Sequence, residues 1–304
     1  KRKGEGARKG FAACLAEPLL NDDPDSPTPP SRDGDDADPT ASSRGDSGSA
    51  GSWGVLTKLI SSCRGMLGSI GKLLSPFCGP LYGSSFVMTP LQEERLRAIR
   101  ARLEVPFSGE LPEHQDALLK LWGAAYPEIE LVPIAGTGLK SEQWKEMGWQ
   151  GTDPGTDFRG GGYMSLEHLL YLTDEKPELF RVLLEKTRGN RSDWEYPFAV
   201  AGLNITFMLT ELLELRVGPT VGRVPSKPPG RALLRMLGAE EQGAALEEVY
   251  CITFELLDLE WLKAGASYMQ FNAVMETTKA RLTQALSEAA ILEPEDVRRA
   301  LRLP

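Results

Sequence analysis

One stretch of the chain gathers the residue types that could do chemistry. Residues 144–162 read WKEMGWQGTDPGTDFRGGG, with one arginine, Arg159, and two aspartates, Asp153 and Asp157. Six of the fifteen residues from 148 to 162, the glycine-rich loop, are glycines, which permit left-handed backbone and close approach. Each aspartate can fold its carboxylate onto local backbone amides. This composition predicts an ordered loop that carries an arginine.

The chemistry of that arginine has two interpretations. A loop fixed by its own aspartates could present the Arg159 guanidinium outward, toward an anion on another molecule. Alternatively, Asp153 or Asp157 forms an ion pair with Arg159, and the arginine has a structural role. The residue types leave both interpretations open.

The motifs that identify other classes of enzyme are absent from the sequence. The chain has no GxGxxG, Walker, HExxH or GxSxG motif, and its two histidines, His114 and His168, lie on predicted helices. Its four cysteines form no CxxC pair, which argues against a zinc site or a disulfide scaffold and fits a reducing compartment. A net charge of −9 argues against a nucleic-acid partner. We expect no metal site and no cofactor.

The elements that position the loop are predicted to be helices, because the apolar residues recur at helical spacing and strand alternation is not evident. Residues 86–304 should therefore form a single, all-α, multi-helix domain. Capping residues place helix starts at Thr89, Ser141 and Ser165. The most apolar helix should be central and buried, with an exposed proline-rich loop after it. The predicted helices span about 90–103, 112–125, 142–147, 166–172, 177–184, 198–215, 231–237, 246–263 and 268–289, with a last one from Pro294, and the loop spans 217–230.

The N-terminal part has a different composition. Residues 21–52 hold no Val, Ile, Leu, Met, Phe, Tyr or Trp, so we expect 1–52 to be a disordered tail. Residues 53–85 carry three basic and no acidic side chains, with an apolar stripe at helical spacing. This basic amphipathic segment either makes weak contact with a membrane surface through 53–77 or docks on a partner. Alternatively, it packs back on the main domain or forms a poor helix, because Gly65, Gly68 and Gly71 weaken it.

The glycine-rich loop and the residues before it resemble a known signature. The pattern W-x3-G-[aromatic]-Q-G-x-D-P-x-T-D-F-R-G-x-G over 144–162 is similar to that of the ELMO (engulfment and cell motility) domain family, in its single-domain, plant-type members. Thirteen positions are specified, and Trp149 replaces the more usual Phe. A weaker resemblance extends over about 90–286 and includes 194–206, whereas the first 85 residues lie outside it.

The resemblance implies a function. Single-domain members of the family act as GTPase-activating proteins for Arf and Arf-like small GTPases, and the arginine at the position of Arg159 is assigned as the catalytic finger. The partner would then be a GTP-bound GTPase that brings its own Mg²⁺. Loop-ordering or partner-binding roles fall to Gln150, Asp153, Asp157, Gly160 and Gly162, and structural anchoring roles to Trp144, Trp149 and Phe158.

A second hypothesis comes from a different class of protein. The domain is then a non-catalytic interaction or scaffold module in trafficking or cytoskeletal signalling, with Arg159 held in an internal ion pair. Under either hypothesis we expect a cytoplasmic protein, peripheral to membranes.

Overall fold

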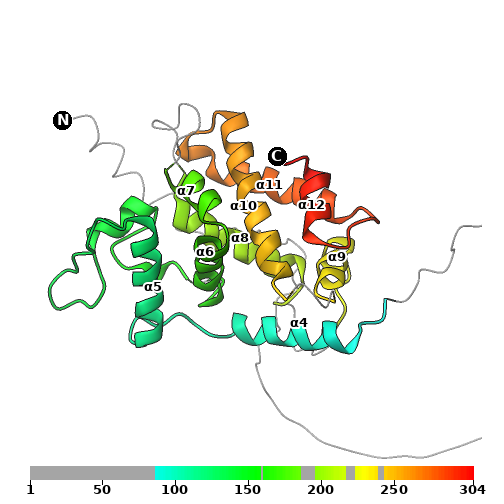
Figure 1. The fold of residues 1–304 in the computed structure, drawn as a ribbon, viewed down its shortest axis with the longest axis horizontal. Helices are drawn as coiled ribbons and strands as arrows, with labels where there is room; N and C mark the ends of the chain where they lie inside the picture. Colours follow the sequence, from blue (N-terminus) through cyan, green and yellow to red (C-terminus); the bar gives the residue numbers. More distant parts are fainter. Residues whose placement is uncertain (1–85, 159, 186–195, 217–222, 239–242) are drawn as a thin grey trace, which may run out of the picture. The chain divides into compact units, whose positions relative to one another are not determined.

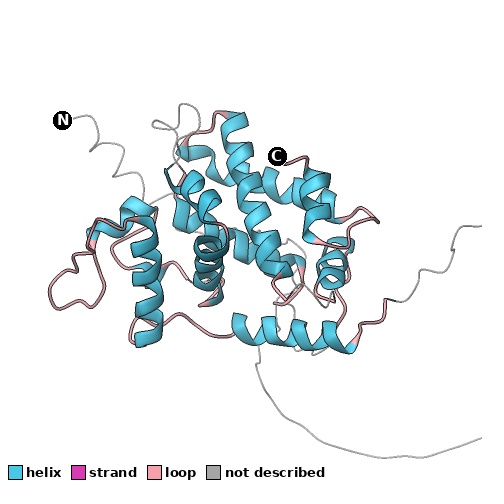
Figure 2. Cartoon of the chain, in the orientation of Figure 1, coloured by secondary structure: helices cyan, strands magenta, loops and turns pink. Residues whose placement is uncertain are grey.

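The structure of the chain is a computed structural model that describes residues 86–158, 160–185, 196–216, 223–238 and 243–304. Every regular element in these ranges is a helix (Figures 1 and 2), so the predicted all-α class is confirmed there. The predicted tail 1–52 and the basic segment 53–85 lie entirely outside the described residues. The helices are α4 (Pro90–Leu103), α5 (Pro112–Ala125), η1 (Glu142–Met147), η2 (Pro154–Thr156), α6 (Met164–Glu175), α7 (Pro177–Glu185), α8 (Phe198–Leu212), α9 (Pro228–Met236), α10 (Ala245–Ala264), η4 (Tyr268–Gln270), α11 (Phe271–Leu286) and α12 (Pro294–Leu301).

Helix α8 supplies the centre of the core, as its uncharged sequence predicts. Helices α6 and α10 both pack against it, and α10 also contacts α11 and α12 (Figure 1). At the start of α8, Phe198 stacks on Phe254 of α10, with ring centroids 5.1 Å apart, and meets Phe180 of α7 at 5.6 Å. Among the described helices, none combines the length and the apolar character that crossing a bilayer requires.

The predicted end of α8 is wrong by three residues. The helix was expected to reach Leu215 but ends at Leu212, because Glu214 adopts a left-handed conformation with φ of 55°. The Glu214 carboxylate accepts the amide N–H groups of Ser226 at 2.9 Å and Lys227 at 3.2 Å, which fixes the approach to α9. Helix α9 starts at Pro228, inside the predicted loop, since proline is well tolerated in a first helical turn.

Two of the three predicted caps are confirmed. Thr89 forms a capping box with Gln92, and Ser141 accepts the amide N–H of Gln143 at 3.3 Å. The Ser165 cap is wrong, because α6 begins at Met164, two residues before the predicted start, with Tyr163 at the N-cap position. The Ser165 amide already donates to the Gly162 carbonyl, and its side chain is buried inside the first turn.

Helix α4 is mainly polar and is attached through its arginines. Arg95 donates to the carbonyl of Leu237 at 2.8 Å. Arg102 forms ion pairs with Glu167 of α6 at 3.0 Å and with Glu247 of α10 at 2.7 Å. These contacts hold α4 and the segment that follows it against the helical core.

His168 lies in the core between α6 and α8. Its side chain is fully buried, and its Nδ1 lies 2.9 Å from the hydroxyl of Thr206. Burial, together with the nearby Arg102 guanidinium, lowers the pKa of His168 to about 3. The folded protein therefore keeps this imidazole neutral.

The buried His168 should make stability depend on pH. Between pH 6.5 and about 3 the unfolded chain protonates this side chain and the folded protein does not, so acidification favours unfolding. We expect the free energy of unfolding of the wild type to fall below pH 6.5, by up to about 1.4 kcal/mol per pH unit more than that of His168→Gln. Urea denaturation over this pH range measures the difference. Parallel pH dependences in the two proteins would contradict the prediction.

Candidate functional site

The two aspartates of the glycine-rich loop hold its backbone in place. Asp153 Oδ1 accepts the amide N–H of Gly155 at 3.0 Å, and its Oδ2 pairs with Lys140 Nζ at 3.0 Å. Asp157 Oδ2 accepts the amide N–H of Gln150 at 2.9 Å. The first contact caps η2, and the last one closes a turn of the loop on itself. Both carboxylates thus act on local structure, whatever other contacts they make.

The three aromatic residues proposed as anchors are all buried. Trp144 and Trp149 are completely inaccessible, and Phe158 is 4% exposed. Their rings form a continuous series, with centroids 6.2 Å apart between Trp144 and Trp149 and 5.3 Å apart between Trp149 and Phe158. Burying three large aromatic side chains stabilises the loop far more than its few hydrogen bonds.

Sequence reasoning missed the other half of this aromatic series. Phe107, in the connection between α4 and α5, stacks on Phe158 with centroids 4.3 Å apart. His114 lies between Phe107, at 5.4 Å, and Tyr163, at 3.9 Å, and its Nδ1 accepts the amide N–H of Ser108 at 3.0 Å. Phe107 follows an irregular segment with no periodicity, so no signal in the sequence placed it beside the loop.

Two glycines allow the loop to approach its neighbours. Gly148 has φ of 87°, and a Cβ there would lie 2.4 Å from the backbone nitrogen of Phe198. Gly162 has φ of 57°, and a Cβ there would lie 2.5 Å from the carbonyl oxygen of Val105. Both positions therefore exclude a side chain on conformational and on steric grounds.

The proposed catalytic residue, Arg159, lies outside the described residues. Both of its neighbours are described. Phe158 is fixed in the aromatic series, and the backbone of Gly160 lies against the ring of Phe207 on α8. Gln150, also proposed for the site, is half-buried, and the described contact of its backbone is the one to Asp157.

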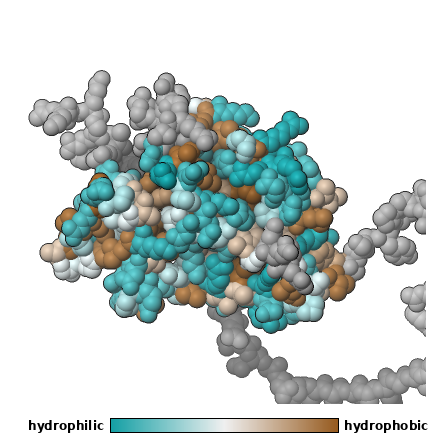
Figure 3. Space-filling view, viewed as in Figure 1, coloured by the Kyte–Doolittle hydropathy of each residue, from teal (hydrophilic) through white to brown (hydrophobic). Residues whose placement is uncertain are grey.

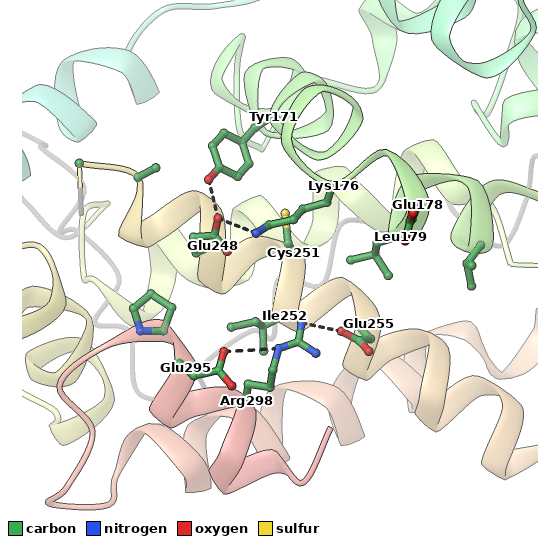
Figure 4. Close-up of a pocket in the computed structure, with 14 residues that line it drawn as sticks. Tyr171, Lys176, Glu178, Leu179, Glu248, Cys251, Ile252, Glu255, Glu295 and Arg298 are labelled. Atoms are coloured by element: carbon green, nitrogen blue, oxygen red, sulfur yellow. Dashed lines mark hydrogen bonds and ion pairs between the residues drawn. The ribbon is translucent and has the colours of Figure 1, made fainter. Parts of the chain in front are cut away.

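A separate cavity of about 670 Å³ lies among α6, α7, α10 and α12 (Figure 4). Four of its charged groups form two ion pairs: Lys176 with Glu248 at 3.0 Å, and Arg298 with Glu255 at 2.8 Å. Burial raises the pKa of the Cys251 thiol there to about 12, so it stays protonated and unreactive. None of the proposed site residues lines this cavity, which we do not regard as the functional site.

No group of three or more His, Cys, Asp or Glu side chains in the described ranges is arranged to hold a metal ion. On the face shown in Figure 3, hydrophobic residues are scattered among hydrophilic ones. The described residues define an all-helical domain that carries one ordered glycine-rich loop.

Comparison with known proteins gives this domain its family. The model of the ELMO/CED-12 family matches residues 97–275, which include the whole loop, and the chain belongs to this family. It is 35% identical over 217 residues to ELMO domain-containing protein A of Dictyostelium discoideum, an alignment that covers 67% of this chain and 22% of the relative. It is also 35% identical over 189 residues to ELMO domain-containing protein 2 of Mus musculus, with 60% and 57% of the two chains covered.

A further relative is ELMO domain-containing protein C of Dictyostelium discoideum, at 30% identity over 199 residues, covering 65% of this chain and 30% of the relative. The chain thus spans between about a fifth and three fifths of the length of these curated relatives. Membership in the family establishes that the chain contains an ELMO domain.

The close approach of Gly148 to the start of α8 should be essential for stability. We expect Gly148→Ala to lower the free energy of unfolding by about 2–5 kcal/mol, because the new Cβ meets backbone atoms and the left-handed conformation is strained. Gly151→Ala, in the same loop, is the matched control: nothing lies within 4 Å of a Cβ there, and its effect should be within about 0.5 kcal/mol. Equal effects of the two substitutions in chemical denaturation would refute this account of the loop.

Proposed function

We propose that this protein is a GTPase-activating protein for GTP-bound Arf or Arf-like small GTPases, and that Arg159 acts in trans as an arginine finger. The observation that carries the proposal is the arginine itself, at the position of the ELMO signature that the family resemblance assigns to the finger. Membership in the ELMO/CED-12 family supports it.

The chemistry of phosphoryl transfer suits this residue type. Negative charge spreads over the oxygens of the transferred phosphoryl group in the transition state. A guanidinium is always charged and planar, and it donates two parallel hydrogen bonds to such oxygens. Supplied in trans, an arginine finger typically accelerates GTP hydrolysis by about 10³–10⁵. The nucleotide and Mg²⁺ belong to the partner, so a chain without a phosphate-binding loop can take part.

The surroundings of residue 159 favour such a role. An inserted group is most effective when its backbone is already ordered, because little conformational entropy is then lost on docking. Phe158 is held by the rings of Phe107 and Trp149, and Gly160 is held against α8. In this proposal Asp153 and Asp157 order the backbone that carries the finger, and Gln150 meets the loop backbone or the partner.

The proposal is tested by GTP hydrolysis with a panel of Arf and Arf-like GTPases. We expect the wild type to accelerate single-turnover hydrolysis on at least one of them. Arg159→Lys and Arg159→Ala should each lower the maximal stimulated rate by about 10³-fold or more, because lysine cannot make the two-pronged contact. The thermal midpoint of both variants should stay within about 2 °C of the wild type.

The opposite pattern would support the non-catalytic module. Stimulation that survives Arg159→Lys would refute the finger mechanism. A wild type that accelerates no GTPase in the panel, together with a loss of about 3–5 kcal/mol of stability in Arg159→Ala, would assign Arg159 to a buried ion pair.

A further inference from the structure

A second arginine stands next to the glycine-rich loop. The Phe207 ring on α8 fills the space beside Gly160, where a Cβ would lie 2.9 Å from Phe207 Cδ2. The guanidinium carbon of Arg216 lies over the same ring, 4.7 Å from its centroid. One phenyl ring therefore contacts both the residue that follows Arg159 and the head group of Arg216.

The Arg216 guanidinium forms no ion pair with a carboxylate in the described part of the chain. Its described contact is the cation–π contact with Phe207, and no ion pair involves it there. Partial burial of the guanidinium lowers the pKa of Arg216 from its usual value. The acidic residue whose charge raises the pKa of Arg216, in opposition to burial, is Glu211, and its carboxylate forms an ion pair with Lys279 at 2.9 Å.

The backbone that carries Arg216 is fixed. Leu215 is 6% exposed, and its amide donates to the carbonyl of Thr210 at 3.1 Å. Glu214 accepts the amide N–H of Ser226 at 2.9 Å. The backbone that leads to Arg216 is thus held by the core, and the Arg216 head group lies over an aromatic ring.

We infer that Arg216 is a second cationic contact of the GTPase-facing surface and binds an oxyanion of the GTP-bound partner. The inference rests on the proposed function, because it requires that the GTPase that docks on the glycine-rich loop also contacts Arg216 beside Phe207. A cation–π contact uses the charge of the guanidinium and leaves its N–H donors available. Those donors form a planar fork that fits the two oxygens of a carboxylate or a phosphate.

The oxyanion has two possible sources within one complex, and kinetics separates them. A carboxylate on the GTPase surface is bound equally in the ground state and the transition state, so losing Arg216 weakens docking alone. A phosphate oxygen of the nucleotide gains charge during hydrolysis, so losing Arg216 lowers the maximal rate. We call Arg216 a binding residue in the first case and a catalytic residue in the second.

The experiment uses the full chain and a GTPase that the wild type stimulates. Arg216→Ala and Arg216→Gln are compared with Arg181→Ala, a matched control that removes an exposed arginine from α7. Each protein is titrated in single-turnover hydrolysis at two ionic strengths, and thermal midpoints are measured alongside. Arg216→Gln keeps most of the side-chain length if the alanine variant folds poorly.

We expect both Arg216 substitutions to raise the concentration for half-maximal stimulation, or to lower the maximal rate, by at least about tenfold, as the loss of a charge-assisted contact does. The first result assigns a carboxylate, and the second assigns a phosphate. Stimulation by the Arg216 variants that matches that of Arg181→Ala would overturn the inference and leave the proposed function intact. A loss that merely follows a lowered thermal midpoint, and is rescued by assay at lower temperature, would show a structural role for Arg216 and also overturn it. A wild type that stimulates no GTPase would overturn both.

Discussion

The close contact between the backbone of the glycine-rich loop and helix α8 is the constraint on which the rest of this domain depends. Gly148 meets the backbone of Pro197 and Phe198 at the start of α8, and Gly160 meets Phe207 further along the helix. A Cβ at Gly161 would lie 3.2 Å from Thr206 of the same helix. A loop pressed against the most buried helix at three points cannot move far without opening the core.

The aromatic series provides a second set of contacts to the loop. Trp149 and Phe158 lie within the loop sequence. Phe107, in the connection after α4, stacks on Phe158, and Trp122 of α5 meets Trp144, just before the loop. Burial of these rings stabilises the fold. Because aromatic pairs prefer particular stacked or edge-to-face geometries, their packing also fixes how the rings are oriented relative to one another. The polar helix α4 contributes to this arrangement. Its Arg102 forms ion pairs with α6 and α10, and these pairs hold the start of the segment that carries Phe107.

Much of this fold can be predicted from the sequence, because helical signals are local. Proline in the first turn and apolar spacing located both ends of α5, and the uncharged run that contains Ala199 identified the buried helix. The cap predicted at Ser165 is wrong, because a serine near the start of a helix need not be its cap. The predicted end of α8 is wrong because the end depends on the contact of Glu214 with Ser226, twelve positions away. Of the site, the sequence indicated the loop and its aspartates, but the stacking of Phe107 and the placing of Arg216 over Phe207 arise from tertiary packing that no short motif encodes.

The central claim is that Arg159 stabilises the transition state of another protein's reaction, and a transition-state analogue tests it most directly. The protein is mixed with the GDP-bound form of a GTPase that it stimulates, with and without aluminium fluoride, and complex formation is followed by size-exclusion chromatography. We predict a stable complex that requires aluminium fluoride and is lost in the folded Arg159→Ala variant. A complex that forms equally well without aluminium fluoride, or with Arg159→Ala, would contradict the account.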